Sequence, residues 1–335
     1  MRDPVMQKRH IVGLLELACQ ELELPKTRFE TAKTAYESVG DWLANCPATG
    51  KYAPRIFPQG SMALGTTVRP LEREEFDVDL VCHFQKLDTR SPQAEVKTAV
   101  GERLERYEEG FGPKLEEYKR CWRLNYSDAS KLHLDITPAV HNPMCGNGGL
   151  SVTDKEKRRW EPTHPEGYVK WFQNRTDLQP DIRSQITEFS AKAASVEPLP
   201  ENEPFKSLLK RSVQLLKRHR SILFAKTPDV APIFVIITTL TARAYENICK
   251  RREIFDTEFD LLLAIVERLH LYVEKRTGVI GQVELWVPNA TTEGENFAEK
   301  WNRPDSPLPR AFLTRLSQLD AIFSFFRVFV ARPAA

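Results

Sequence analysis

Charge of one sign is what this 335-residue chain most clearly lacks. It carries 48 basic and 46 acidic side chains, which leaves a formal net charge of only +2. A protein that binds long DNA or RNA over a broad surface usually has a clear excess of positive charge. The composition therefore gives no reason to expect a DNA partner, although a chain of this net charge can still contain a local basic groove.

The sequence also lacks a secretion signal and long apolar runs. The N-terminal residues MRDPVMQKRH contain no apolar segment of the kind that a signal peptide needs. The most apolar run, from Ala231 to Leu240, is shorter than the roughly 20 residues that span a bilayer. We therefore expect a cytoplasmic protein without a membrane partner, in which this run is a buried helix.

Paired cysteines are absent as well. None of the six cysteines stands in a C-x-x-C arrangement, and they are scattered along the chain. Such a distribution is typical of reduced thiols in a cytosolic protein. Cys82-His83 and the stretch from His141 to Cys145 come closest to the spacing of zinc ligands, but neither forms a recognisable zinc site.

Hydrophobic periodicity predicts helices at both ends of the chain and an α+β region between them. Residues 5–45 have helical spacing that breaks at Leu24-Pro25. Residues 55–140 alternate short strands with one amphipathic helix, and residues 141–200, rich in Pro, Gly and charge, resemble a long connection with short helices. From residue 205 onward the pattern is helical, including a last helix over 308–328.

The fold class that follows is α+β, with a mixed sheet flanked by helices and a helical domain after it. The change of composition near residue 200 gives the predicted domain boundary. We expect a domain over 1–200, which includes the N-terminal helices, and a helical domain over 201–335.

Alternation places three carboxylates on sheet faces opposite to apolar residues. In FDVDLVCHF, which begins at Phe76, Asp77 and Asp79 leave one strand on the same side, roughly 7 Å apart along the backbone. In KLHLDITPAV, Asp135 faces away from the apolar set of its own strand. If the two strands pair side by side, the three carboxylates converge on one face.

Three converging carboxylates suit divalent cations. Bare carboxylates repel one another unless positive charge neutralises them. Oxygen ligands of this kind favour Mg²⁺ or Mn²⁺, and two such ions are the usual clamp for in-line attack at phosphorus. We therefore predict two Mg²⁺ ions, with Mn²⁺ as a possible substitute, at Asp77, Asp79 and Asp135. Taken alone, Asp-x-Asp is more often the solvated face of a half-buried strand.

The turn Gln59-Gly60-Ser61 is a candidate phosphate site. It ends a predicted strand and opens a predicted helix, so it offers free backbone N–H groups and a hydroxyl to a phosphate. A glycine allows close approach of the backbone. A single Gly-Ser turn is weak evidence, but the order of this turn, the Asp-x-Asp strand and a later Asp is specific. It predicts a cradle for a triphosphate followed by the ions that bridge the triphosphate to a nucleophile.

This order resembles the nucleotidyltransferase superfamily that includes the polymerase β-like enzymes. The chain is further similar to the bacterial cGAS/DncV-like nucleotidyltransferases (CD-NTases) from about Leu24 to Trp301. The similarity rests on QGSMALGTTVRP with EFDVDLV, LHLDITPA, KRRWEPTHPEGYVKWF, VQLLKRHR and VPNATTEGENFAEKW. It implies a polymerase β-like core and a C-terminal helical domain that closes the nucleotide cleft, hence a bilobed molecule.

The resemblance also assigns roles to residues. Asp77, Asp79 and Asp135 match the family's catalytic and metal-binding triad. Gln59, Gly60 and Ser61 match its phosphate turn.

The function implied by the resemblance is a metal-dependent cyclic oligonucleotide synthase. Such enzymes condense nucleoside triphosphates, ATP being an expected one, into a cyclic di- or trinucleotide and release pyrophosphate. The product is a second messenger of bacterial anti-phage (CBASS) signalling and reaches a downstream effector. Two alternatives stay open. One is a linear nucleotidyltransferase that acts on RNA, protein or a small molecule; the other is an inactive nucleotide sensor, against which the intact set of three Asp argues.

Polar residues share one face of the helix predicted from residue 205, at spacings of three and four. They are either a solvated face or a set that reaches the triphosphate: Lys206, Lys210, Gln214, Lys217 and Ser221. Lys217 is the candidate nucleotide-binding residue, because it matches the LLK position of the family.

Other candidates have weaker support. Arg69 and Arg73 flank the Asp-x-Asp strand as surface charges or phosphate contacts, and His133 is more often a neighbour of Asp135 than a base. The run from Gly146 to Gly149 is a turn and does not fit a dinucleotide-binding motif. In the C-terminal stretch that is typical of the family, we expect structural support of the cleft from Asn289, Asn296 and Trp301.

Overall fold

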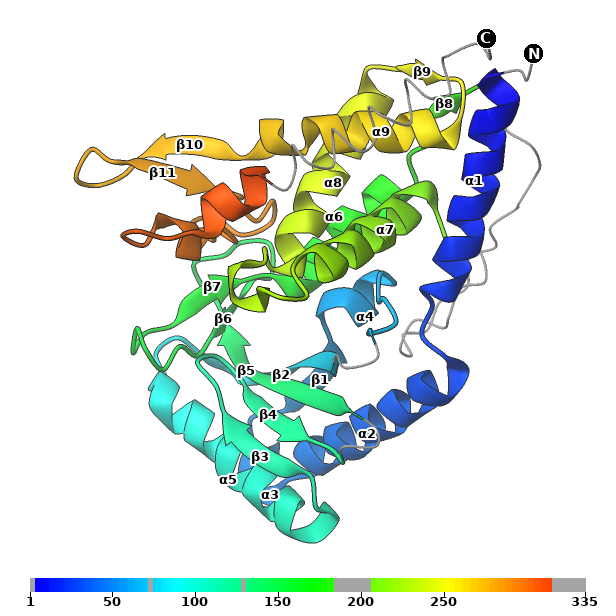
Figure 1. The fold of residues 1–335 in the computed structure, drawn as a ribbon. Helices are drawn as coiled ribbons and strands as arrows, with labels where there is room; N and C mark the ends of the chain where they lie inside the picture. The colour runs from blue at the N-terminus through cyan, green and yellow to red at the C-terminus, as the bar shows by residue number, and fades with distance from the viewer. Residues whose placement is uncertain (1–3, 72–74, 128–130, 184–205, 315–335) are drawn as a thin grey trace.

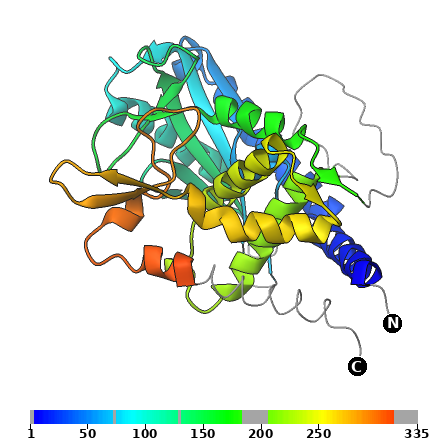
Figure 2. The ribbon, with the colours of Figure 1, turned by 90° about the horizontal axis from the view of Figure 1, so that it is seen from above.

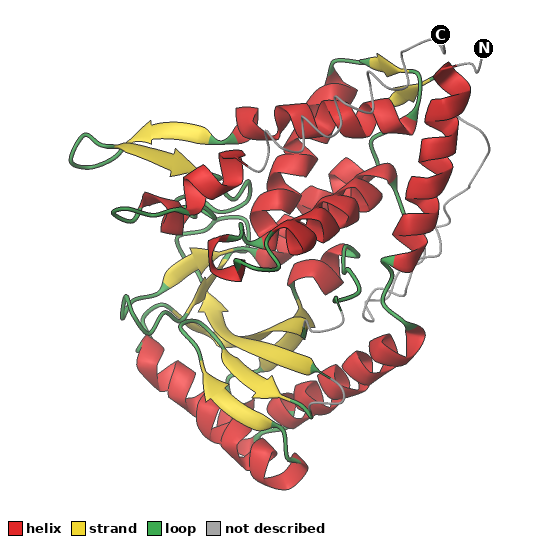
Figure 3. Ribbon diagram, viewed as in Figure 1, coloured by secondary structure: helices red, strands yellow, loops and turns green. Residues whose placement is uncertain are grey.

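Two lobes make up the fold of this computed structural model, which describes residues 4–71, 75–127, 131–183 and 206–314. A mixed sheet with helices on one face forms the first lobe, and a bundle of helices with a projecting hairpin forms the second (Figures 1 and 3). The short helix α4 (Gly60–Leu64) contacts both lobes. The predicted α+β, bilobed fold is confirmed.

The sheet has the order β1-β2-β5-β4-β3, with β6 beside β5 and β7 beside β6. Only β2 and β5 pair in parallel within this sheet, and its other pairs are antiparallel. The strands are β1 (Pro54–Pro58), β2 (Phe76–Asp88), β3 (Lys114–Glu117), β4 (Trp122–Asn125), β5 (Leu132–His141), β6 (Leu150–Val152) and β7 (Glu161–Thr163). Three of these strands were not predicted: β3, β6 and β7 lie in stretches without an expected strand.

One face of this sheet is closed by α2 (Lys26–Ala44) and α5 (Gln93–Phe111). The alternation of β2 turns Phe76, Val78 and Leu80 into the core between sheet and helices, where all three are buried. The same alternation leaves the acidic residues on the opposite face, which is turned toward the helical lobe.

The second lobe has its own apolar core. Buried residues of α6, α7, α8 and α9 meet there, and Figure 2 shows these helices packed together with the hairpin β10–β11 projecting from one side. The elements are α6 (Pro165–Thr176), α7 (Leu208–Leu223), α8 (Phe234–Lys250), α9 (Glu258–Arg268), β10 (Glu274–Thr277) and β11 (Val283–Trp286). The hairpin was not predicted.

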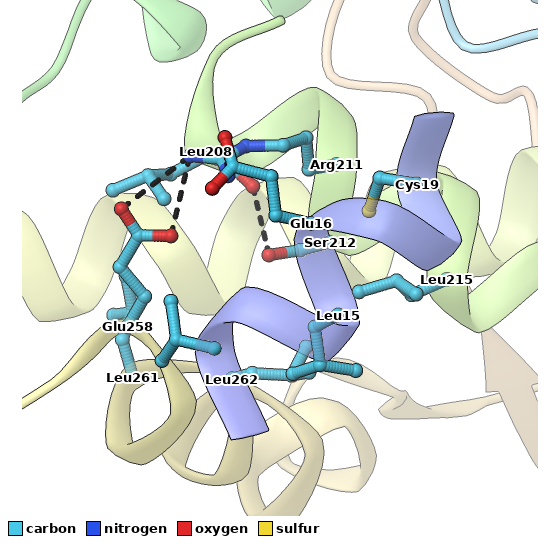
Figure 4. Close-up of a pocket in the computed structure, with 11 residues that line it drawn as sticks. Leu15, Glu16, Cys19, Leu208, Arg211, Ser212, Leu215, Glu258, Leu261 and Leu262 are labelled. Atoms are coloured by element: carbon cyan, nitrogen blue, oxygen red, sulfur yellow. Dashed lines mark hydrogen bonds and ion pairs between the residues drawn. The ribbon is translucent and has the colours of Figure 1, made fainter. Parts of the chain in front are cut away.

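The N-terminal helix α1 (Pro4–Glu21) joins the helical lobe rather than the sheet. Figure 4 shows its junction with α7 and α9, where leucine side chains line a small pocket together with Arg211, Glu16 and Glu258. The guanidinium of Arg211 lies 3.2 Å from Glu258 and 3.8 Å from Glu16. Burial at this junction raises the pKa of the Cys19 thiol to about 11, so this thiol stays protonated at neutral pH.

The apolar cores of the two lobes do not follow the predicted boundary near residue 200. Tyr168 and Phe172 of α6, within 1–200, belong to the core of the helical lobe. The boundary near residue 200 itself lies outside the described residues, as do Arg73 and most of the helix predicted over 308–328. In the described part of the chain, no helix combines the length and apolarity needed to cross a membrane.

The packing of α5 on β4 makes a testable prediction. An added Cβ at Gly101 would clash with the indole ring of Trp122, 2.7 Å from Cε2 and 2.9 Å from Cη2. That ring is fixed, because its Nε1–H donates to the carbonyl of Lys97 at 3.0 Å. Gly101→Ala should therefore destabilise the protein by about 1–3 kcal/mol in urea unfolding, although alanine is the better helix former.

A matched control lies in the same helix. An added Cβ at Gly110 meets nothing within 4 Å. Gly110→Ala should therefore stabilise the protein by about 0.4–1 kcal/mol. Equal effects of the two substitutions would contradict the packing described for Trp122.

Candidate active site

The register of β2 and β5 brings the predicted carboxylates together. Asp79 is the direct partner of Asp135 across the parallel pair, and Asp77 is the partner of His133. Asp77 is half exposed, whereas Asp79 and Asp135 are largely buried between the lobes. The prediction that three carboxylates share one sheet face is confirmed.

Arg123 on β4 is the residue of this site that the sequence analysis missed. Its Nε and Nη2 atoms donate to the two carboxylate oxygens of Asp135 at 2.7 and 2.8 Å. Nη2 also lies 3.2 Å from Asp77, and Nη1 lies 3.2 Å from Nδ1 of His133. The alternation of CWRLNY, with Trp and Leu on one face and Arg on the other, could have pointed to it.

Burial and nearby charge perturb the carboxyl of Asp79. Burial, together with the neighbouring charges of Asp135 and Asp77, raises its pKa from 3.8 to about 7. Arg123 and Lys217 oppose the increase but do not cancel it. The two positive charges therefore offset only part of the cost of ionising Asp79 at this buried position.

The carboxylate of Asp79 leaves no room for a side chain at position 60, which is a glycine. Its φ angle is +63°, and an added Cβ would clash with Oδ2 of Asp79 and stand 3.2 Å from its Cγ. The backbone N–H of Gln59 donates to the carbonyl of Asp79 at 2.9 Å. The predicted phosphate turn and the Asp-x-Asp strand are thus in direct contact, with Ser61 in the first turn of α4.

Lys217 enters the site from the helical lobe. Its side chain is buried, and Nζ donates to the carbonyl and hydroxyl oxygens of Thr66 at 3.1 and 2.9 Å. Burial lowers its pKa to about 7, against the opposing influence of Asp79. The lysine therefore holds the loop that follows α4, close enough to Asp79 for the two charges to interact.

The polar face of α7 is not solvated. Gln214 donates to the carbonyl of Thr67 at 2.8 Å, and Lys206, just before the helix, pairs with Glu23 at 2.6 Å. All the described members of this face are buried or partly buried. The solvated-face alternative is wrong, because this face packs on α4, its following loop and the end of α1.

The remaining candidates lie where their contacts are structural. Arg69 stands 3.9 Å from Glu21 at the surface. In the C-terminal stretch, the side-chain amide of Asn289 donates a hydrogen bond to Glu295, and that of Asn296 donates one to the carbonyl of Leu285. Trp301 is buried in the core of the helical lobe. These contacts agree with the expected structural support. His133 is buried beside Asp77 and Arg123.

The oxygen donors at this site fit a divalent cation, and Arg123 already occupies the oxygens of one of them, Asp135. Asp77 and Asp79 share one sheet face and offer the hard oxygens that divalent cations prefer. Within the described ranges, however, no three Asp, Glu, His or Cys side chains lie close enough together to hold a metal ion as they are placed. To become a metal ligand, Asp135 would have to give up at least one of its two hydrogen bonds from Arg123 or bind the metal alongside them.

The fold and the order of its motifs are those of a polymerase β-like nucleotidyltransferase. Residues 12–176 match the family described as Second Messenger Oligonucleotide or Dinucleotide Synthetase domain, SMODS. A c-di-GMP synthase from Roseivirga ehrenbergii is 30% identical over 316 residues, 93% of this chain and 78% of that protein. The cyclic dinucleotide synthase CdnG of Bradyrhizobium diazoefficiens is 28% identical over 90% of this chain and 72% of that protein.

Solved structures agree. The Bradyrhizobium diazoefficiens CdnG in complex with GTP has a TM-score of 0.69 at 25% identity, over 94% of this chain and 91% of that chain. Vibrio cholerae DncV with the linear intermediate 5′ pppA(3′,5′)pG has a TM-score of 0.55 at 14% identity, over 97% and 85%, which shows the shared fold. The chain belongs to the bacterial cGAS/DncV-like nucleotidyltransferases, the CD-NTase family that its motifs predict.

The raised pKa of Asp79 predicts how stability depends on pH. Between about pH 4 and 7 the folded state keeps a proton that the unfolded state has lost, so stability falls as pH rises through this window. Asp79→Asn removes this loss. It should stabilise the metal-free protein at pH 8 by roughly 1–3 kcal/mol, seen as a higher melting temperature, and the gain should shrink toward pH 4. Asp41→Asn, at an exposed carboxylate on α2, is the control.

The contact between Gly60 and Asp79 gives a second prediction. Gly60→Ala must strain a positive φ and displace the Asp79 carboxylate. Gly65→Ala strains an equal φ of +64°, but its Cβ would meet only the end of the Lys210 side chain, at 3.2 Å. Both should lower the melting temperature, but only Gly60→Ala should lower nucleotidyl transfer, by about a hundredfold. Equal activity losses would mean that Asp79 placement is not the cause.

Proposed function

We propose that this protein is a cyclic dinucleotide synthase that uses GTP as a substrate. The observation that carries the proposal is the pairing of Asp79 with Asp135, with Asp77 on the same sheet face and Asp79 in contact with the Gly-Ser turn. Two relatives whose names describe cyclic dinucleotide synthesis support it, and so does the GTP bound in the CdnG structure.

The proposed chemistry is attack of a ribose hydroxyl on the α-phosphorus of a second nucleotide. One P–O bond forms, the bond to the β-phosphate oxygen breaks, and pyrophosphate leaves. Two Mg²⁺ ions at Asp77, Asp79 and Asp135, or Mn²⁺ in their place, would supply neutralisation of the triphosphate and activation of the hydroxyl. A second transfer within the linear intermediate closes the ring.

The chain's own residues supply position and charge for this chemistry. The backbone N–H groups of Gly60 and Ser61 are proposed to bind the triphosphate. Lys217 supports this turn through Thr66 and brings positive charge toward Asp79. Because α7 and α4 belong to different lobes, the site is complete only where the lobes meet.

Finer features remain part of this proposal. A dinucleotide product is favoured over a trinucleotide by the names of both relatives. Guanine is favoured over other bases by the name of the Roseivirga ehrenbergii relative and by the GTP of the CdnG complex. ATP stays an expected second substrate. A role in anti-phage (CBASS) signalling through a downstream effector follows from the family resemblance alone.

Product analysis tests the proposal. The full chain is incubated with Mg²⁺ and GTP alone, and with all four nucleoside triphosphates, and the products are separated by chromatography and identified by mass spectrometry. We expect a cyclic dinucleotide that contains guanine, resistant to phosphatase, and one pyrophosphate for each bond formed.

Two controls sharpen the test. Excess EDTA should abolish product formation, and Asp77→Asn should lower turnover by orders of magnitude while the melting temperature changes little, because Asp77 is half exposed. Exclusively linear products would favour the linear nucleotidyltransferase instead. Full turnover in EDTA would remove the metal-based proposal.

A further inference from the structure

Arg123 binds the carboxylate oxygens of Asp135 that a divalent cation would use as ligands. Its fork donates to both carboxylate oxygens of Asp135, at 2.7 and 2.8 Å, so neither oxygen is free of a charged donor. The same guanidinium lies 3.2 Å from Asp77. One side chain thus contacts two of the three predicted metal ligands.

The surroundings hold Arg123 in this place. β4 pairs with β5 so that Arg123 is the direct partner of Asp135. Its guanidinium lies over the ring of Tyr118, 4.8 Å from the centroid, and is only 19% exposed. A planar fork fixed on both sides is suited to a bidentate carboxylate bond, which a lysine could not make.

The charges explain why such a residue is needed. Three carboxylates on one sheet face, two of them largely buried, repel one another when no cation is present. Arg123 is the positive charge with direct contacts to two of them, whereas Lys217 contacts Thr66 and acts on Asp79 only at longer range. In the metal-free protein the guanidinium therefore compensates part of the charge that metal would compensate in the active one.

We propose that Arg123 is an internal counter-ion that competes with the divalent cation for Asp135 and Asp77. It is a positioning residue, which keeps the carboxylates in register without metal and releases at least one oxygen of Asp135 when metal binds. This inference rests on the proposed metal-dependent function.

Competition has two measurable consequences. Without metal, loss of Arg123 leaves buried carboxylates uncompensated and should lower the melting temperature. With metal, the same loss removes both a competitor for the oxygens and a repelling positive charge. The affinity for the cation should therefore increase, by about tenfold or more. A residue with a merely structural role would lower stability without tightening metal binding.

The test measures Mn²⁺ binding to the nucleotide-free full chain by electron paramagnetic resonance, together with melting temperatures at increasing Mn²⁺. Arg123→Met should bind Mn²⁺ about tenfold more tightly than the wild type and should gain more melting temperature from saturating Mn²⁺. Arg123→Lys keeps the charge and loses the fork, so its affinity should fall between the two.

Arg175 provides a matched control in the helical lobe. It is 15% exposed, donates to Glu246 at 2.7 and 3.0 Å, and lies over the ring of Trp171 at 4.1 Å. Arg175→Met should lower the melting temperature and leave the Mn²⁺ affinity unchanged.

The outcomes separate the inference from the proposed function. If the wild type and Arg123→Met bind Mn²⁺ equally, or the variant binds it more weakly, Arg123 is not a competitor and the inference fails alone. If neither binds Mn²⁺ and neither is stabilised by it, the metal site itself fails, and the proposed function fails with it. Tighter binding by Arg123→Met, including binding that the wild type does not detectably show, supports the inference.

Discussion

The parallel register of β2 and β5 is the constraint on which the site depends. It places Asp79 and Asp135 at partner positions, where like charges destabilise a sheet. The register is held from the other face, because Val78, Leu80 and Ile136 are fully buried against α2 and α5. A slip by one residue would turn the carboxylates into that core. The core therefore imposes the repulsion that the site then has to balance.

Positive charge for this balance comes from two directions. Arg123 reaches the carboxylates from the neighbouring strand, and Lys217 comes from the helical lobe. Burial costs Lys217 part of its charge, since its pKa falls to about 7. The lysine stays in place because Thr66 accepts two hydrogen bonds from it. The meeting of the lobes thus has an electrostatic as well as an apolar component.

The turn before α4 shows how one residue can serve two requirements. A glycine at position 60 is predicted because a phosphate needs close approach of the backbone. The structure adds a second reason, since any side chain there would displace the carboxylate of Asp79. The phosphate turn and the carboxylate strand therefore constrain each other before any substrate is present.

The sequence by itself determined most helices, the two central strands and the face on which each residue of those strands lies, because alternation and helical spacing are local properties of the chain. Phe76, Asp77, Val78 and Asp79 could be assigned to opposite faces without a structure. It also indicated the family, through the order of its motifs. It could not show the role of Arg123, whose bond to Asp135 depends on the pairing of two strands.

Only the tertiary structure decided which polar residues are buried. The polar spacing of α7 is equally consistent with a solvated face, and its burial follows from the packing of the lobes around α4. The same holds for α1, which sequence order assigns to the sheet lobe and packing assigns to the helical one. The physical reason is that burial and ion pairing arise between segments far apart in the chain, for which local periodicity carries no signal.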